Sequence, residues 1–190
     1  WSMEAVVTIN SATLVNKGLE IIEAHYLFGL PYSDIEAVIH PQSVVHSLVE
    51  FNDGSTIAQA SPPNMKGAIA YAMNWPDRLN KSTAPIDWSI PHTWSFAPIN
   101  AKQFPSIDLA RHCGEVGGGL PAIFNAANEA AVAAFISKKL EFKSIVGVIA
   151  GVVADLEKDS PKTLRDLSDV SALEDDARTR AQAHLLRLAP

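Results

Sequence analysis

The stretch NSATLVNKGLE, residues 10–20, gathers small polar and charged side chains just before a helical pattern begins. Ser11 and Thr13 offer hydroxyl donors, Asn16 offers an amide and Lys17 adds a full positive charge. The first backbone N–H groups of a helix lack partners, and the helix dipole places partial positive charge at that end. These donors together match the acceptor oxygens of a phosphate monoester. The stretch therefore predicts an anion site suited to phosphate.

A carboxylate lies one helical turn beyond these donors. Glu20 follows Asn16 and Lys17 at spacings that let the three side chains share one face of a helix. A carboxylate close to a phosphate is repelled unless a cation lies between them. The pattern therefore favours a divalent metal held partly by Glu20, and oxygen ligands favour magnesium or manganese.

The same residues also fit an ordinary helix start. Ser and Thr before a helix are common caps, and Lys17 with Glu20 can form a surface ion pair that contributes about 0.2–0.5 kcal/mol. The stretch has no glycine-rich signature of a nucleotide loop. The glycine-rich run GEVGGGL at 114–120 follows a helical segment, which is the wrong context for a dinucleotide fingerprint. Spacing alone leaves both interpretations open.

Three further groups carry reactive residue types. His40 and His46 in HPQSVVH could bind metal or move protons, although their spacing fits no metal-ligand pattern, and His40 could equally satisfy the polar groups of a proline turn. Cys113 has cationic neighbours but no partners of a nucleophilic triad, which favours an inert thiol. The segment NAANEAAVAAF at 125–135 presents an alanine-rich face, which is typical of close helix packing.

The elements around the polar stretch follow from hydrophobic periodicity. Residues 5–9 are mostly β-branched and predict a buried strand, and a helix is expected from about Val15 to Gly29. Two strand-like runs, IEAVIH and SVVHSLVEF, precede the hairpin turn NDGS and the strand TIAQA. Strict alternation in the second run would place His46 and Glu50 on one face. The segment SPPNM then predicts a short helix to about Met73.

The second half of the chain reads as a connecting stretch and a helical bundle. Five prolines from Trp75 to Pro105 mark the connection, and its aromatic residues predict packing on a surface. The predicted fold class is α+β, a mostly antiparallel sheet with flanking helices followed by a four-helix bundle-like domain. The last helix is expected to start with a capping box of Ser171 and Glu174. The four helices are expected at 105–114, 120–139, 142–158 and 171–188. The predicted divisions are residues 1–75, 76–104 and 105–190, with the main boundary near residue 100.

Composition narrows the function classes. The chain has 190 residues and a formal net charge of −6, and its 15 Lys and Arg residues form no run, which argues against nucleic acid as a partner. The longest apolar run, residues 144–156, is shorter than the roughly 20 residues that span a bilayer, which argues against a membrane partner. A single cysteine excludes an internal disulfide. These features make a folded cytoplasmic protein the default expectation.

Three long strings carry a family resemblance: NSATLVNKGLEIIEAHYLFGLP, VIHPQSVVHSLVEFNDGSTIAQASPPNMK and FNAANEAAVAAF. They resemble 1-deoxy-D-xylulose 5-phosphate reductoisomerase over essentially the whole chain. The resemblance implies an NADPH- and divalent-metal-dependent enzyme, using Mn²⁺ or Mg²⁺, that makes 2-C-methyl-D-erythritol 4-phosphate in the non-mevalonate route to isoprenoids. It also implies that this chain corresponds to the second half of the catalytic domain, the connection and the helical domain, while the N-terminal cofactor-binding half is missing.

The resemblance assigns roles to the polar stretch. Ser11, Asn16 and Lys17 match the family's contacts to the substrate phosphate, and Glu20 matches one of three carboxylates that hold the metal. The other two carboxylates lie upstream of the present chain. The resemblance therefore makes the stretch a cradle for a sugar phosphate, with Glu20 as a catalytic, substrate-binding and metal-binding residue.

The remaining site residues come from the same resemblance. Trp1 and Met3 match a flap that closes over substrate, with Trp1 packing on the sugar carbons. His46 is implied as a catalytic residue lining the active site, and Met65 as a residue near the nicotinamide. Glu4 departs from the pattern because the family usually carries glycine there, close to the cofactor. With Met3 and Met65, Glu4 completes the implied cofactor contacts.

Two rival functions remain open. The family forms homodimers through its catalytic domain, so the chain could act as a non-catalytic dimerisation or scaffolding module. An unrelated sugar-phosphate-binding protein would instead bind phosphate without needing a metal. The principal expectation is that the chain supplies part of a reductoisomerase site and is inactive alone.

Overall fold

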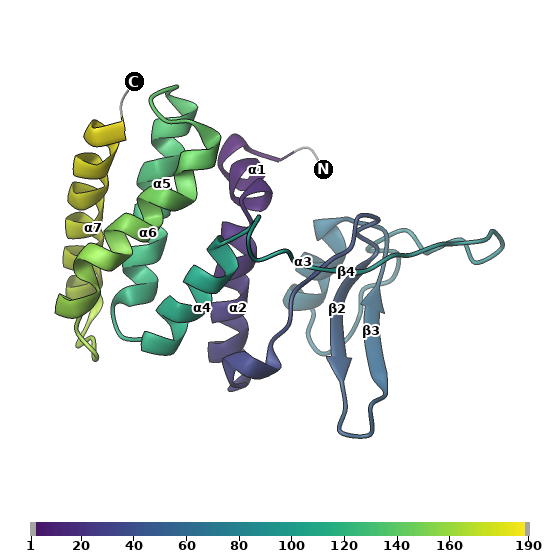
Figure 1. The fold of residues 1–190 in the computed structure, drawn as a ribbon. Coiled ribbons are helices and arrows are strands. Elements are labelled where there is room, and N and C mark those ends of the chain that lie inside the picture. Colours follow the sequence, from purple (N-terminus) through teal and green to yellow (C-terminus); the bar gives the residue numbers. More distant parts are fainter. Residues whose placement is uncertain (1–2, 189–190) are drawn as a thin grey trace. The chain divides into compact units, whose positions relative to one another are not determined.

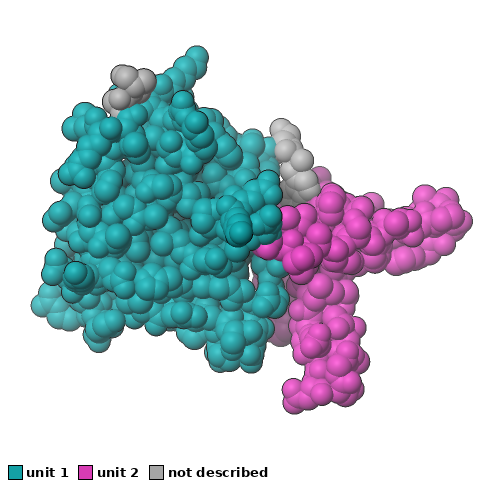
Figure 2. All heavy atoms as spheres, in the orientation of Figure 1, with its two compact units in different colours: residues 1–37, 100–190 teal, residues 38–99 magenta. Residues whose placement is uncertain are grey.

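A computed structural model describes residues 3–188 of the chain. The chain divides into two compact units, one made of residues 1–37 together with 100–190 and the other of residues 38–99 (Figure 2). The first unit is therefore discontinuous in sequence. Each unit is described by itself below.

Helices build the discontinuous unit, here called unit 1. Within it α5, α6 and α7 lie side by side, and α2 lies against α4 (Figure 1). Its α-helices are α1 (Ala5–Ala12), α2 (Val15–Phe28), α4 (Ser106–Val116), α5 (Leu120–Ile136), α6 (Ile145–Leu156) and α7 (Leu167–Leu188). Short 3-10 turns occupy Tyr32–Asp34, Phe142–Ser144 and Glu157–Asp159.

The core of unit 1 centres on α5. Leu120, Ile123 and Phe124 are fully buried there, and α6 adds a continuous apolar face that includes Ile145 and Ile149. Four alanines of α5 are buried as well, Ala126, Ala127, Ala131 and Ala134, which brings neighbouring helices close and confirms the packing interpretation of residues 125–135. Burial of this apolar surface provides the main stabilisation of the unit.

Residues 38–99, here called unit 2, form two small antiparallel sheets and one helix. Strand β1 (Val38–Ile39) pairs with β4 (Ala97–Pro98), and β2 (Val45–Glu50) pairs with β3 (Thr56–Ala60). Helix α3 (Met65–Met73) follows the hairpin, and the Asn64 side chain accepts a hydrogen bond from Lys66 N at its start. Among residues 38–99, all of which the structure describes, none is buried.

Several sequence predictions are confirmed. The α+β class is confirmed, and α2 ends before Gly29, which adopts a left-handed φ of 66°. The NDGS turn closes the β2–β3 hairpin, where Asp53 accepts hydrogen bonds from the backbone and hydroxyl of Ser55. Helix α3 and the four later helices occur close to the predicted ranges. Within the described residues 3–188, no helix combines the length and apolarity needed to cross a membrane.

The strand predicted at residues 5–9 is wrong, because these residues belong to helix α1. Strand propensity depends strongly on context, and a helix can use β-branched threonines by bonding their hydroxyls to the preceding turn. Thr8 Oγ1 donates to Glu4 O at 3.1 Å, and Ser11 Oγ donates to Val7 O at 2.8 Å. Only Ile9 of this helix is buried.

Two other local predictions are wrong. Helix α7 begins at Leu167, so Ser171 and Glu174 lie inside it and form no capping box; Asp166 accepts from Ser168 N at 2.8 Å instead. The strands expected to form one antiparallel sheet form two separate two-stranded sheets, because β1 pairs with the distant β4 and not with β2.

The compact units also divide differently from the predicted ranges. Residues 1–37 group with the C-terminal helices because α2 packs against α4. Arg111 of α4 reinforces this grouping by donating to Tyr32 O and Ile35 O, each at 2.5 Å. Most of the predicted connection belongs to unit 2, where Ala97–Pro98 closes the β1–β4 pair.

Candidate functional site

The predicted polar stretch forms a sharp bend between α1 and α2. Thr13 ends α1, is buried, and donates its hydroxyl to Ile9 O at 3.0 Å. Leu14 follows in the left-handed conformation, with φ 56° and ψ 15°, and α2 begins at Val15. Such a conformation costs a residue other than glycine about 1–2 kcal/mol, so the surrounding structure must hold it. The bend leaves the first turn of α2 as a helix N-terminus, as an anion site requires.

Three predicted site residues meet on the first turns of α2. Asn16 Nδ2 donates to Glu20 Oε1 at 2.6 Å, and Lys17 Nζ donates to Glu20 Oε2. The side chains of Lys17 and Glu20 are 42% and 44% exposed, so an incoming ligand can reach both. Ser11 lies on the last turn of α1, where its hydroxyl already donates to Val7 O and would have to rotate to bind an anion. The geometry thus joins an amide, a cation and a carboxylate at one helix start.

The side chains around Glu20 bear on whether it can bind a metal. Both carboxylate oxygens accept hydrogen bonds from neighbouring side chains, so they are oriented and reachable, but they compete with Asn16 and Lys17. Magnesium and manganese prefer about six oxygen ligands, of which one carboxylate supplies one or two. Between residues 3 and 188 no group of three or more His, Cys, Asp or Glu side chains could hold a metal ion. Glu20 therefore fits a metal only as one ligand of a site that other groups complete.

The other predicted site residues belong to different parts of the chain. Met3 and Glu4 precede α1 in unit 1, and Glu4 starts that helix without a side-chain cap. Met65 is the first residue of α3 in unit 2 and is 56% exposed. Trp1 lies outside the described residues. Met3 and Met65 both offer exposed apolar side chains, which suits contact with a ring of a cofactor but identifies none.

His46 lies at an irregularity of the β2–β3 ladder. The register shifts between Val45 and Ser47, so the strict alternation that placed His46 with Glu50 is wrong at this point. A bulge of this kind redirects a side chain, because one extra residue enters the strand. His46 Nε2 lies 3.0 Å from Ser61 O and the ring remains exposed. The bulge gave no signal in the sequence pattern.

His40 has a structural role in unit 2. Its Nε2 accepts hydrogen bonds from Val44 N and Val45 N, both at 3.1 Å, and its Nδ1 lies 2.9 Å from Ser95 O. The ring therefore satisfies the backbone around the proline turn, which was one of the two interpretations of this residue. Phe96 stacks on it with ring centroids 4.4 Å apart.

Cys113 is fully buried on α4, and this burial raises the pKa of its thiol to about 12. A thiol with so high a pKa carries almost no thiolate at neutral pH, which supports the inert interpretation.

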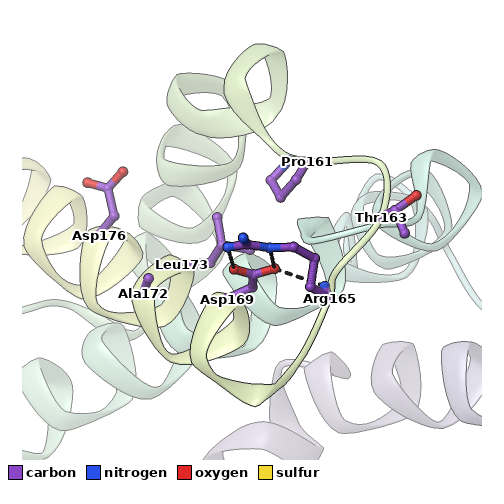
Figure 3. Close-up of a pocket in the computed structure, with 7 residues that line it drawn as sticks. All are labelled: Pro161, Thr163, Arg165, Asp169, Ala172, Leu173 and Asp176. Carbon is purple, nitrogen blue, oxygen red and sulfur yellow. Dashed lines mark hydrogen bonds and ion pairs between the residues drawn. The ribbon is translucent and has the colours of Figure 1, made fainter.

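A separate hollow of about 350 Å³ lies beside the start of α7 and contains none of the predicted site residues (Figure 3). Arg165 and Asp169 face each other in it, and the guanidinium donates from Nε and Nη2 to the two carboxylate oxygens at 3.0 and 2.6 Å. This hydrogen bonding to Arg165 lowers the pKa of Asp169 to about 2. The charges of Arg165 and Asp169 thus satisfy each other.

The fold and the bend together define the class: an α+β chain in which a helical core supports a polar helix start. Residues 60–180, more than half of the chain, match the family model described as "DXP reductoisomerase C-terminal domain". The chain therefore belongs to the 1-deoxy-D-xylulose 5-phosphate reductoisomerase family. Residues 1–28 match the model described as "1-deoxy-D-xylulose 5-phosphate reductoisomerase C-terminal domain".

Named relatives support this membership. The 1-deoxy-D-xylulose 5-phosphate reductoisomerase of Mycobacterium marinum is 50% identical over 192 residues, covering 100% of this chain and 47% of the relative. The enzyme of the same name from Kitasatospora griseola is 52% identical over 182 residues, covering 96% of this chain and 47% of the relative. The chain thus spans about half the length of the curated relatives it matches.

Solved structures of similar fold carry the same family name. A DOX-P reductoisomerase in complex with NADPH, fosmidomycin and magnesium aligns with a TM-score of 0.93 and 36% identity, covering 100% of this chain and 48% of that one. The reductoisomerase from Zymomonas mobilis in complex with NADPH aligns with a TM-score of 0.88 and 39% identity, covering 95% of this chain and 47% of that one. Those complexes thus hold a reduced nicotinamide cofactor and, in the first, magnesium.

Proposed function

We propose that this chain is the part of a 1-deoxy-D-xylulose 5-phosphate reductoisomerase that supplies the substrate-phosphate cradle and one metal carboxylate, and that it is inactive alone. The observation that carries the proposal is the cluster of Asn16, Lys17 and Glu20 at the start of α2. Family membership supports the substrate and the product, 2-C-methyl-D-erythritol 4-phosphate.

In the proposed site, Ser11, Asn16 and Lys17 bind the phosphate and fix one end of the substrate. Energy from this remote contact orients the reacting carbons, which is how a non-reacting group accelerates a reaction. Glu20 serves as one ligand of Mg²⁺ or Mn²⁺. When bound, the metal acts as a Lewis acid towards the substrate oxygens. Because Lys17 now donates to Glu20, substrate binding transfers this lysine from a carboxylate to a phosphate.

The remaining residues are proposed around the NADPH and the sugar. Met3 and Met65 contact the cofactor through apolar side chains, and His46 serves as a catalytic residue of the active site. Trp1 covers the sugar carbons as part of a flap, which excludes water from the reaction. Glu4 places a negative charge beside an anionic cofactor, so replacing it with glycine is expected to strengthen NADPH binding.

The test measures the loss of NADPH absorbance with 1-deoxy-D-xylulose 5-phosphate and manganese. This chain is compared with a protein extended upstream to the length of its relatives. In the longer protein, Glu20→Gln removes a metal ligand and is expected to lower kcat on the order of 100-fold. Glu23→Gln, three residues along the same helix, is the matched control and should retain activity. Wild-type turnover in the Glu20→Gln protein would refute the assignment.

A dimerisation or scaffolding role is the second candidate. It is favoured by the exposed apolar side chains of unit 2, which include Leu48, Phe51 and Ile57, at 47%, 47% and 64% exposure. A homodimer would cover such a surface. Light scattering of the eluted protein distinguishes the candidates, because a monodisperse monomer at micromolar concentration would remove this role.

A further inference from the structure

We propose that Ser106, on α4, is a positioning residue for the phosphate cradle. It fixes the bend at Thr13 and the left-handed Leu14, after which Asn16 and Lys17 follow, and it does so without touching the ligand. The inference rests on the proposed function, because it assumes that these side chains bind phosphate. Sequence reasoning gave Ser106 no role.

A single buried hydrogen bond joins Ser106 to the bend. Its Oγ donates to Thr13 O at 2.6 Å across 93 residues of sequence. Ser106 is fully buried and Thr13 is 5% exposed, so water cannot readily replace the hydroxyl. A buried carbonyl that loses its donor is costly, which makes this contact a strong restraint on the local backbone.

The restraint acts where the backbone needs one. Leu14 has a φ of 56°, a value that residues other than glycine rarely adopt. The turn's own bonds are local: Leu14 N donates to Ser11 O at 3.1 Å, and Gly18 N donates to Leu14 O at 3.0 Å. Ser106 is the contact that ties the bend to a distant element of the core. A strained conformation persists only where its surroundings over-determine it.

A second contact with α4 lies one turn further along α2. A Cβ placed on Gly18 would come within 2.6 Å of Ala110 Cβ and 3.4 Å of Ser106 O, so the two helix backbones approach closely. Val15 and Gly18 are buried on this face, whereas Asn16 and Lys17 are only partly buried. Helix α4 therefore supports α2 from the side opposite the polar cluster. Ser106 fixes the N-terminal end of α2, where Asn16 and Lys17 lie.

The experiment measures phosphate binding by the 190-residue chain. Inorganic phosphate is titrated while the backbone amide resonances of Asn16 and Lys17 are followed by NMR. Ser106→Ala removes the donor, and Ser106→Cys keeps a similar shape with a weak donor. Cys113→Ala is the matched control, because it removes a buried atom from the same helix. Thermal unfolding of each variant verifies folding, and Ser106→Cys serves if Ser106→Ala does not fold.

The dissociation constant for phosphate is expected to rise about fivefold in Ser106→Ala and by a smaller factor in Ser106→Cys. It should stay within about twofold of wild type in Cys113→Ala. Equal affinities of wild type and Ser106→Ala would overturn the positioning role alone and leave the cradle intact. Equal weakening by Cys113→Ala would also overturn it, since general loosening would then explain the effect. A wild-type chain that binds no phosphate would refute the cradle, and the positioning role with it.

Discussion

Unit 1 and unit 2 differ in the interactions that stabilise them. Unit 1 has a core in which Phe124, Ile149 and their neighbours are fully buried. Unit 2 buries none of its residues 38–99, although it contains many large apolar side chains. Hydrogen bonds and aromatic stacking around His40 take the place of a core there. Because a two-stranded hairpin is only marginally stable in water, unit 2 is expected to need a further surface, whereas unit 1 already buries a core of its own.

The largest expected contrast is in thiol reactivity. Cys113 is inaccessible in unit 1 and the pKa of its thiol is raised to about 12, so an aromatic disulfide reagent should react only when the unit opens. Ser47→Cys in a Cys113→Ala background places a single thiol on β2 of unit 2. Cys113 should react at least about 1,000-fold more slowly than the thiol at position 47. Similar rates at the two positions would remove the difference between the units.

Truncating a large apolar side chain should also affect the two units differently, with a large loss of stability in unit 1 and a small one in unit 2. Phe124→Ala is expected to lower the free energy of unfolding of unit 1 by about 3–5 kcal/mol, because it removes a fully buried ring from α5. Ile57→Ala in unit 2 removes a side chain that is 64% exposed and should change stability by less than about 0.5 kcal/mol. Urea denaturation followed by helical circular dichroism measures both. A large loss at Ile57 would show that unit 2 is covered in solution.

Two helical glycines of unit 1 differ in the space around them: Gly18 packs closely against α4, whereas Gly147 has free space beside it. Gly18→Ala puts a Cβ 2.6 Å from Ala110 Cβ and should destabilise by about 1–3 kcal/mol through overpacking. In Gly147→Ala the new Cβ would meet no atom of another element within 4 Å, so the substitution should stabilise the unit by up to about 1 kcal/mol, since alanine favours helix. Both values come from thermal or urea unfolding. Effects of the same sign would contradict the close approach of α2 to α4.

The smallest expected effect concerns acid. The hydrogen bond from Arg165 lowers the pKa of Asp169 from 3.8 to about 2. The ionised carboxyl therefore contributes stability that is complete above about pH 4 and is lost as the pH falls through 2. Asp169→Asn should weaken the fall in the melting temperature of unit 1 across this range. Asp53→Asn in unit 2, where Ser55 lowers the carboxyl pKa, should leave that temperature unchanged. Identical acid profiles for wild type and Asp169→Asn would exclude the linkage.

Sequence patterns predicted what depends on neighbours along the chain. Hydrophobic periodicity from Val15 and the stop at Gly29 marked α2, and the polar cluster on it was predicted from helix geometry. Residues 5–9 misled because β-branched side chains favour strands, whereas the segment is the helix α1, in which only Ile9 is buried. The pattern could not reveal Ser106 either, because its role depends on a carbonyl 93 residues away.

The insertion of residues 38–99 between the two parts of unit 1 has a consequence for biosynthesis. At a translation rate of about 5–20 residues per second, roughly 60 inserted residues delay the partners of α1 and α2 by about 3–12 s. During that interval the nascent chain exposes Ile9, Val15 and Ile22, which later become buried. Aggregation or chaperone capture of the nascent polypeptide should therefore depend on these side chains.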